Sequence, residues 1–190
     1  ITSAFTGSND SANGPSRDVL ASPVRLEVIG NGTRLAWKGG EPRIVRRTSG
    51  AVTWRTKLSN ADALMEINAK MECDGYVNYQ VTFTARKAMT MDDIRLLIPY
   101  ARPIATYMMG MGFKGGRRPR RWDWKWDKTR ANNMVWIGDV NAGMQCKLKN
   151  ETPDWSLYNF DKTVPYKDWR NEGLGGCSLT EEANSFLFRA

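Results

Sequence analysis

The sequence predicts an all-β fold, an antiparallel β-sandwich built from two large sheets. Apolar and polar residues alternate in many short segments, and Gly (17) and Pro (8) punctuate the whole chain. No stretch longer than about two turns follows the 3.6-residue period of a helix. With 190 residues, 41% of them hydrophobic, the chain has enough apolar material for a packed core. No apolar run approaches the ~18 residues that a membrane-spanning helix needs.

The two ends of the chain differ from its middle. Residues 1–20 are rich in Ser, Asn, Gly and Thr and are expected to form a flexible arm or linker, with the sandwich over residues 21–190. The chain begins at Ile1 without Met and ends on Phe186-Leu187-Phe188, which is typical of the middle of a strand. We therefore expect a piece of a longer polypeptide.

The first predicted hairpin follows from the agreement between a turn and the period-two pattern around it. Asn31-Gly32 is a favoured two-residue turn. It places Val28 opposite Leu35 and Leu26 opposite Trp37. All four apolar side chains then share one face, which supports this register.

A second hairpin is predicted with Cys73-Asp74-Gly75 at its tip. A two-residue loop would set the apolar face of one strand against the polar face of the other. A three-residue loop with Gly75 in the left-handed conformation instead pairs Met71 with Val77. The two strands of this hairpin and the further predicted strands span residues 63–71, 77–85, 44–48, 52–57, 94–98, 134–138, 144–149 and 185–189.

The most unusual segment runs from Lys114 to Arg130. It holds eight basic and two acidic residues, so it carries +6 of the net charge of +8. Guanidinium groups and indoles together are typical of nucleic-acid binding. The alternation argues against that function, because it places three indoles on one side of a strand and charges of both signs on the other. The candidate site residues are Trp122, Trp124, Trp126, Arg120, Arg121, Asp123, Lys125 and Asp127.

Two interpretations of the three indoles remain. They pack between sheets or against a neighbouring domain, which is the usual place for Trp. Alternatively, they form a carbohydrate platform, because indoles about 7 Å apart along a strand suit successive sugar rings. The flanking Asp, Arg and Lys would then bind the sugar hydroxyls. Of the two interpretations, the first is favoured.

The residues predict no catalytic or metal site in this chain. Without histidine, no Ser-His-Asp, Cys-His or His-metal site can form. Cys73, Cys146 and Cys177 lack CxxC spacing, so three reduced core thiols are favoured over one disulfide. The Asp139–Gly143 segment is expected to be a hairpin turn and not a calcium loop. Solvated turns are expected at Asp92-Asp93 and Glu181-Glu182, and a flexible loop over Lys114–Arg117.

Four motifs, taken in order, carry a family resemblance. They resemble the N-terminal β-sandwich region of large exported bacterial proteins, found especially in gut Bacteroidetes, that are similar to glycoside hydrolase family 123. The motifs are Met109–Pro119, with Met-Gly-Met-Gly-Phe-Lys-Gly-Gly; Trp122–Asp127; Val135–Gln145, with Val-Trp-Ile-Gly-Asp-Val-Asn-Ala-Gly; and Trp169–Gly176.

The resemblance implies a galactose-mutarotase-like supersandwich directly before a (β/α)8 barrel. It also implies an exported protein, periplasmic or at the cell surface. The family's catalytic Asp-Glu pair, which assists the substrate's acetamido group, would lie in the barrel, and no residue of this chain matches it. The expected function is a non-catalytic accessory domain that packs on the barrel and shapes its glycan cleft, without a cofactor.

Two alternatives to the accessory function stay open. One is an autonomous carbohydrate-binding module that uses the Trp platform, and the less favoured one is a nucleic-acid-binding protein. The expected partner is the barrel of the same polypeptide, with a glycan as a further candidate. Neither nucleic acid nor a membrane span is expected.

Overall fold

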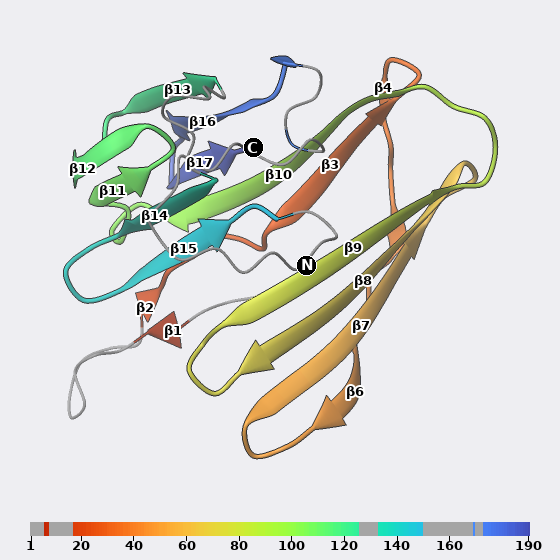
Figure 1. The fold of residues 1–190 in the computed structure, drawn as a ribbon, viewed down its shortest axis with the longest axis horizontal. Helices are drawn as coiled ribbons and strands as arrows, with labels where there is room; N and C mark the ends of the chain where they lie inside the picture. The colour runs from red at the N-terminus through yellow and green to blue at the C-terminus, as the bar shows by residue number, and fades with distance from the viewer. Residues whose placement is uncertain (1–5, 8–16, 126–132, 150–168, 170–172) are drawn as a thin grey trace. The chain divides into compact units, whose positions relative to one another are not determined.

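The computed structural model describes residues 6–7, 17–125, 133–149, 169 and 173–190 (Figure 1). Most of these residues lie in strands, and the strand pairs are antiparallel, which confirms the all-β class. No helix in the described part of the chain is long and apolar enough to cross a membrane. The chain divides into a first unit, Glu27–Ile94, and a second unit, Thr2–Leu26 with Arg95–Ala190.

The first unit is built on one sheet with the strand order β5-β7-β8-β9, in which β6 also pairs with β7. The long strands β7, β8 and β9 lie side by side (Figure 1). One face of β8 is buried and apolar, whereas the opposite face carries ion pairs such as Lys57–Glu66 at 2.6 Å. The strands are β5 (Lys38–Gly39), β6 (Arg43–Arg47), β7 (Ala51–Ser59), β8 (Ala63–Glu72) and β9 (Val77–Ala85).

The Asn31-Gly32 turn connects β3 (Arg25–Gly30) to β4 (Thr33–Arg34). Asn31 and Gly32 have φ angles of 49° and 72°, as a two-residue hairpin turn requires. The backbone of Leu35 donates to Val28, in the predicted register. The predicted continuation of the strand to Trp37 is wrong, because β4 ends at Arg34. Trp37 instead packs edge-on against Phe83 of β9, with ring centroids 6.1 Å apart.

The second predicted hairpin is confirmed between β8 and β9. Met71 pairs with Val77, and Gly75 has a φ of 87°. The Asp74 carboxylate accepts a hydrogen bond from the backbone of Tyr76 at 2.9 Å, which stabilises the three-residue loop.

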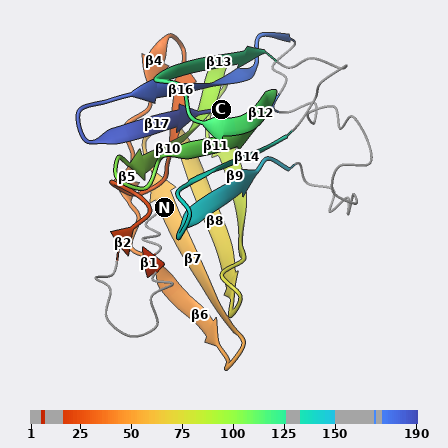
Figure 2. The same cartoon turned by 90° about the vertical axis from the view of Figure 1, so that its left-hand side faces the viewer.

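The second unit holds two four-stranded arrangements, β13-β16-β17-β10 and β12-β11-β14-β15. Figure 2 shows β11 beside both β12 and β14. The strands are β10 (Met91–Ala101), β11 (Tyr107–Gly110), β12 (Phe113–Arg117), β13 (Arg121–Lys125), β14 (Met134–Gly138), β15 (Gly143–Lys147), β16 (Gly176–Glu181) and β17 (Ser185–Arg189). The largest fully buried side chains here are Tyr100, Ile104, Met108, Met111, Val135, Ile137, Leu148, Leu179, Phe186 and Phe188.

Residues from the expected N-terminal arm also form β structure. Strand β1 (Thr6–Gly7) pairs with β2 (Arg17–Asp18), and Leu20 forms an isolated bridge with Tyr100. The side chains of Val19 and Leu20 are buried. The boundary at residue 20 stays a prediction.

Two expected irregular segments are strands. Lys114–Arg117 was expected to be a loop, but it belongs to β12, where Gly115 and Gly116 have φ angles of 118° and 128°. Glycine tolerates these angles, so the segment pairs with β11 instead of forming a loop. Asp92-Asp93 lies in β10, not in a turn, and Asp92 accepts a hydrogen bond from the backbone of Gly32 at 2.7 Å.

The Asp139–Gly143 segment is the predicted turn between β14 and β15. The Asp139 carboxylate accepts hydrogen bonds from the backbones of Asn141 and Ala142, both at 2.8 Å. These bonds explain why an aspartate begins this turn.

Candidate functional site

The predicted indole segment is strand β13, which carries Trp122 and Trp124. Trp126 and Asp127 lie outside the described residues. Trp122 stands opposite Leu179 and Trp124 opposite Cys177 of β16. Because Leu179 and Cys177 are buried, the two indoles lie on the core-facing side of this sheet.

Both described indoles are half-buried and make packing contacts. The Trp122 N–H donates to the backbone carbonyl of Met111 at 3.1 Å, and its ring lies edge-to-face with Phe113 at 5.2 Å. The six-membered ring of Trp124 lies against Gly112, whose missing side chain makes room for it. These contacts fit the packing interpretation, and a carbohydrate or domain interface at these indoles stays a prediction.

The other side of β13 is charged, as the alternation predicts. The Arg121 Nε atom lies 2.7 Å from an oxygen of Asp123. This hydrogen bond raises the pKa of Arg121 above its ordinary value. Lys125 donates to the backbone carbonyl of Leu174 at 2.8 Å. The charges on this side of the strand therefore satisfy one another or the backbone instead of forming a uniformly positive surface.

A second set of charges, the arginine–glutamate cluster, consists of Arg102, Arg120, Arg189, Glu181 and Glu182. Arg102 lies 2.5 Å from Glu181, Arg120 lies 3.5 Å from Glu181, and Arg189 lies 3.3 Å from Glu182. Glu181 is the last residue of β16, where it pairs with Phe186 of β17, so it does not lie in the expected solvated turn, whereas Glu182 follows the strand. Within the cluster, the hydrogen bond from Arg102 is the main cause that lowers the pKa of Glu181 below its ordinary value.

Arg118 adds a partly buried cation beside this cluster. Its guanidinium carbon lies 3.1 Å from the centre of the Phe186 ring, and its Nε atom donates to the backbone carbonyl of Ala105. Burial lowers the pKa of Arg118 from its ordinary value. The ring face and the carbonyl compensate for water lost from the guanidinium.

Glu181→Gln is expected to lower thermal stability near neutral pH and to have no effect in acid. The hydrogen bond from Arg102 is the largest cause that holds the pKa of Glu181 below 4.5. A carboxyl whose pKa is lower in the folded state stabilises the fold at pH values above its pKa in the unfolded state. This stabilisation is lost as the pH falls through its pKa in the folded state. Thermal unfolding of both proteins between about pH 7 and about pH 3 tests this. If the melting temperatures of the wild type and the variant differed by the same amount at every pH in that range, the prediction would be contradicted.

The outward side of the β11-β14-β15 sheet forms a further surface, the Trp136 face. The inward side of β14 holds the buried Val135 and Ile137. On the opposite side, Trp136 stands between Met109 of β11 and Gln145 of β15. The Trp136 face consists of Tyr107, Met109, Trp136, Gly138, Gly143 and Gln145.

Two glycines determine how Trp136 lies. Gly138 and Gly143 are paired across β14 and β15, on the same side as the indole. A Cβ atom at either glycine would lie 2.6 Å from Cζ2 of Trp136. The indole therefore lies over the glycine backbone instead of standing away from the sheet.

Sequence reasoning missed this surface. Trp136, Gly138 and Gly143 are present in the Val135–Gln145 motif, but Gly143 is expected there only as part of a hairpin turn, and no surface is predicted from the three residues. The available signal is a Trp two residues before a Gly, with a second Gly just across the predicted turn. Period-two alternation places all three on one face.

The three cysteines are free thiols. Cys73 is exposed, contrary to the expected core position, because it lies in the β8–β9 loop. Burial raises the pKa of both Cys146 and Cys177 to about 12. Within the described ranges, no group of three or more Cys, Asp or Glu side chains is placed to hold a metal ion.

One protein family matches the sequence. Its model, described as glycoside hydrolase 123, third domain, matches residues 1–190. This confirms the resemblance drawn from the four motifs, although the description numbers the domain third and gives no support to an N-terminal position. Neither a curated protein nor a solved structure matches.

Proposed function

Because the chain belongs to the family of glycoside hydrolase 123 third domains, we propose that it is a non-catalytic accessory β-sandwich that works beside the catalytic domain of the same polypeptide. In this proposal it packs on the catalytic barrel and helps to shape the glycan cleft. The parent protein would be exported to the periplasm or the cell surface, as the resemblance implies.

The observation that supports this proposal is that carboxylates of this chain are paired with arginines. A glycosidase needs a carboxylic acid with a raised pKa and a second carboxylate at about 5–9.5 Å from it. Glu181 has the opposite property, because Arg102 lowers its pKa. Asp123 and Glu182 also lie beside arginines, Arg121 at 2.7 Å and Arg189 at 3.3 Å. A carboxylate whose pKa is lowered by a guanidinium, as in Glu181, is poorly suited to donate a proton to a glycosidic oxygen.

The same pairing argues against nucleic acid as a partner. Non-specific binding of nucleic acid requires basic side chains that release counterions from phosphates. Arg121, Arg102 and Arg189 are each paired with a carboxylate of this chain. A phosphate would have to displace these carboxylates.

The accessory role is tested with the full polypeptide, the polypeptide lacking residues 1–190, and the 190-residue chain alone. We expect the chain alone to release no nitrophenol from nitrophenyl glycosides. Removal of the domain is expected to lower kcat/KM for a polymeric glycan more than for the small glycosides, since only the polymer extends along the cleft. Turnover by the chain alone, or unchanged kinetics after its removal, would refute the proposal.

The alternative of a carbohydrate-binding module is favoured by one specific observation, the indole that lies over Gly138 and Gly143.

A further inference from the structure

We propose that the Trp136 face binds a pyranose ring of a glycan, with the sugar stacked on the indole of Trp136. This inference rests on the proposed function, because the glycoside hydrolase family supplies the class of ligand. It assigns carbohydrate contact to β11, β14 and β15, and not to the indoles of β13.

The orientation of the indole is the first argument. Trp136 is half-buried, as expected for a ring with one face against the backbone of Gly138 and Gly143 and the other face outward. The electron-rich face of an indole attracts the partly positive C–H groups on one side of a pyranose ring. A flat, outward ring face presents this surface without any movement of the backbone.

The two glycines are the second argument. Glycine inside a strand weakens it, and it often marks a position where another group approaches the backbone closely. At Gly143 the close group is the ring of Trp136 itself, and at Gly138 the ring and the backbone of Ala142 and Gly143 both lie close. The glycines therefore weaken the strands but allow the indole to lie flat on the backbone, which creates a flat aromatic surface.

The surroundings of the indole are the third argument. Tyr107 and Met109, on the adjacent strand, are 39% and 47% exposed. Gln145, opposite Trp136, is exposed, and so is Arg117, opposite Tyr107. An apolar surface bordered by a phenol, an amide and a guanidinium matches a sugar, whose apolar ring face is surrounded by hydroxyl groups.

The surface favours a sugar over a protein or a nucleic acid. Its large apolar side chains are Tyr107, Met109 and Trp136, whereas a stable protein interface takes roughly 20 residues on each partner. A nucleic-acid strand would need several cations along its backbone. The register places two cations on this side of the sheet, Arg117 next to Tyr107 and Lys147 two residues after Gln145.

The test uses the 190-residue chain and five probes: cellotetraose, xylotetraose, mannotetraose, β1,4-galactotetraose and chitotriose. We expect at least one probe to bind with a Kd of about 1 mM or lower and to shift the NMR signal of the Trp136 indole N–H. Trp136→Ala is expected to weaken binding at least about tenfold, and Trp136→Phe to restore part of it.

Gly143→Ala tests the geometry while retaining the indole. The φ of Gly143 lies outside the left-handed range, so alanine is tolerated by the backbone, but its Cβ would displace the ring. We expect it to weaken binding about as much as Trp136→Ala. Tyr76→Ala, at an exposed aromatic residue on the β8–β9 loop, is the matched control and should bind like the wild type.

Unchanged affinity in folded Trp136→Ala and Gly143→Ala proteins would overturn the proposal, as would the absence of binding by all five probes. Circular dichroism and thermal unfolding establish that the variants are folded. These outcomes can be distinguished from those that test the accessory role, because that role is tested by turnover and by deletion of the domain. A chain that binds no probe can still be an accessory domain, whereas a chain that hydrolyses glycosides is not one.

Discussion

Gly110→Ala is expected to destabilise the protein by about 4 kcal/mol, a large fraction of the stability of an ordinary domain. Gly110 ends β11 with a φ of 103°, an angle that costs an L-residue about 1–2 kcal/mol. A Cβ atom there would also overlap the carbonyl oxygen of Met134 on β14. That oxygen belongs to the backbone of a paired strand, so it cannot rotate away.

Gly116→Ala is the matched control for this prediction. Gly116 has a φ of 128°, but no heavy atom lies within 4 Å of a Cβ atom at this position. It should therefore show the cost of the backbone angle alone, about 1–2 kcal/mol. Urea unfolding followed by tryptophan fluorescence measures both variants. Equal losses of stability in the two would show that contact with Met134 has no role.

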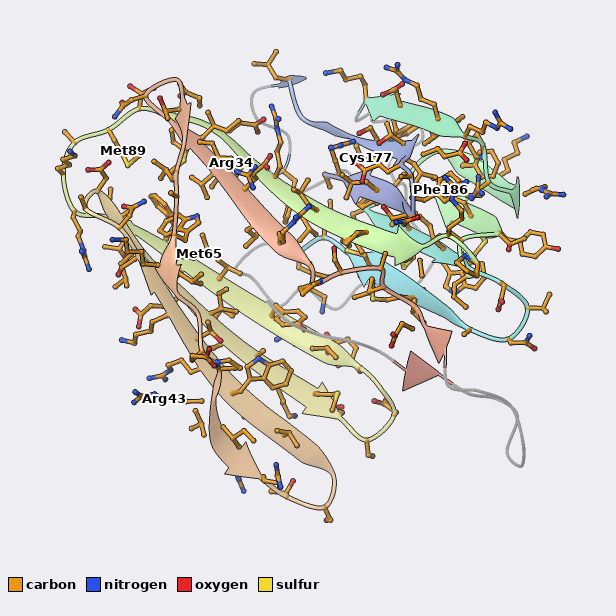
Figure 3. All side chains as sticks on the ribbon, turned by 180° about the vertical axis from the view of Figure 1, so that it is seen from behind. Arg34, Arg43, Met65, Met89, Cys177 and Phe186 are labelled. Atoms are coloured by element: carbon orange, nitrogen blue, oxygen red, sulfur yellow. The ribbon has the colours of Figure 1, made fainter. Side chains whose placement is uncertain are left out.

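Phe186→Ala is expected to lower the free energy of unfolding by about 4 kcal/mol. Phe186 belongs to β17 and is labelled in Figure 3. It is fully buried and pairs with Tyr100 of β10. Its removal leaves a cavity and deprives the Arg118 guanidinium of the ring face at 3.1 Å. The partly buried cation then has less compensation for its lost hydration.

Phe186→Leu and Arg118→Met separate the two effects. The leucine variant keeps most of the volume and should cost less than about 2 kcal/mol. Combining Phe186→Ala with Arg118→Met should cost less than the sum of the single changes, because the interaction is lost only once. Strict additivity in urea unfolding would rule out the contribution of the Arg118–ring contact.

The features that the sequence predicts well depend on neighbouring residues. In the β8–β9 hairpin, the loop residue Gly75 and the alternation on both sides independently require the same register, Met71 with Val77. The Asn31-Gly32 turn was predicted for the same reason. Strand alternation also placed the indoles and the charges of β13 on opposite sides.

The features that were missed depend on which strands pair in the folded chain. Asp92 lies in a strand because β10 is hydrogen-bonded into a sheet, and its carboxylate accepts a hydrogen bond from the backbone of Gly32, about sixty residues away. Glycine-rich β12 was expected to be a loop, because the conformational freedom of Gly115 and Gly116 usually indicates one. Pairing with β11 determines their conformation instead. Gly143 was expected only as part of a turn, and its contact with Trp136 follows from the β14–β15 register.

Because the three thiols are buried to different extents, they can be modified selectively with thiol reagents. Cys73, exposed on a hairpin loop, is accessible to maleimide or iodoacetamide in the native state. At neutral pH almost none of the Cys146 or Cys177 thiol is thiolate, the form that reacts, because their pKa is about 12. A fluorophore therefore attaches to the first unit of the folded molecule, and later modification of the other two thiols records the opening of the second unit over time.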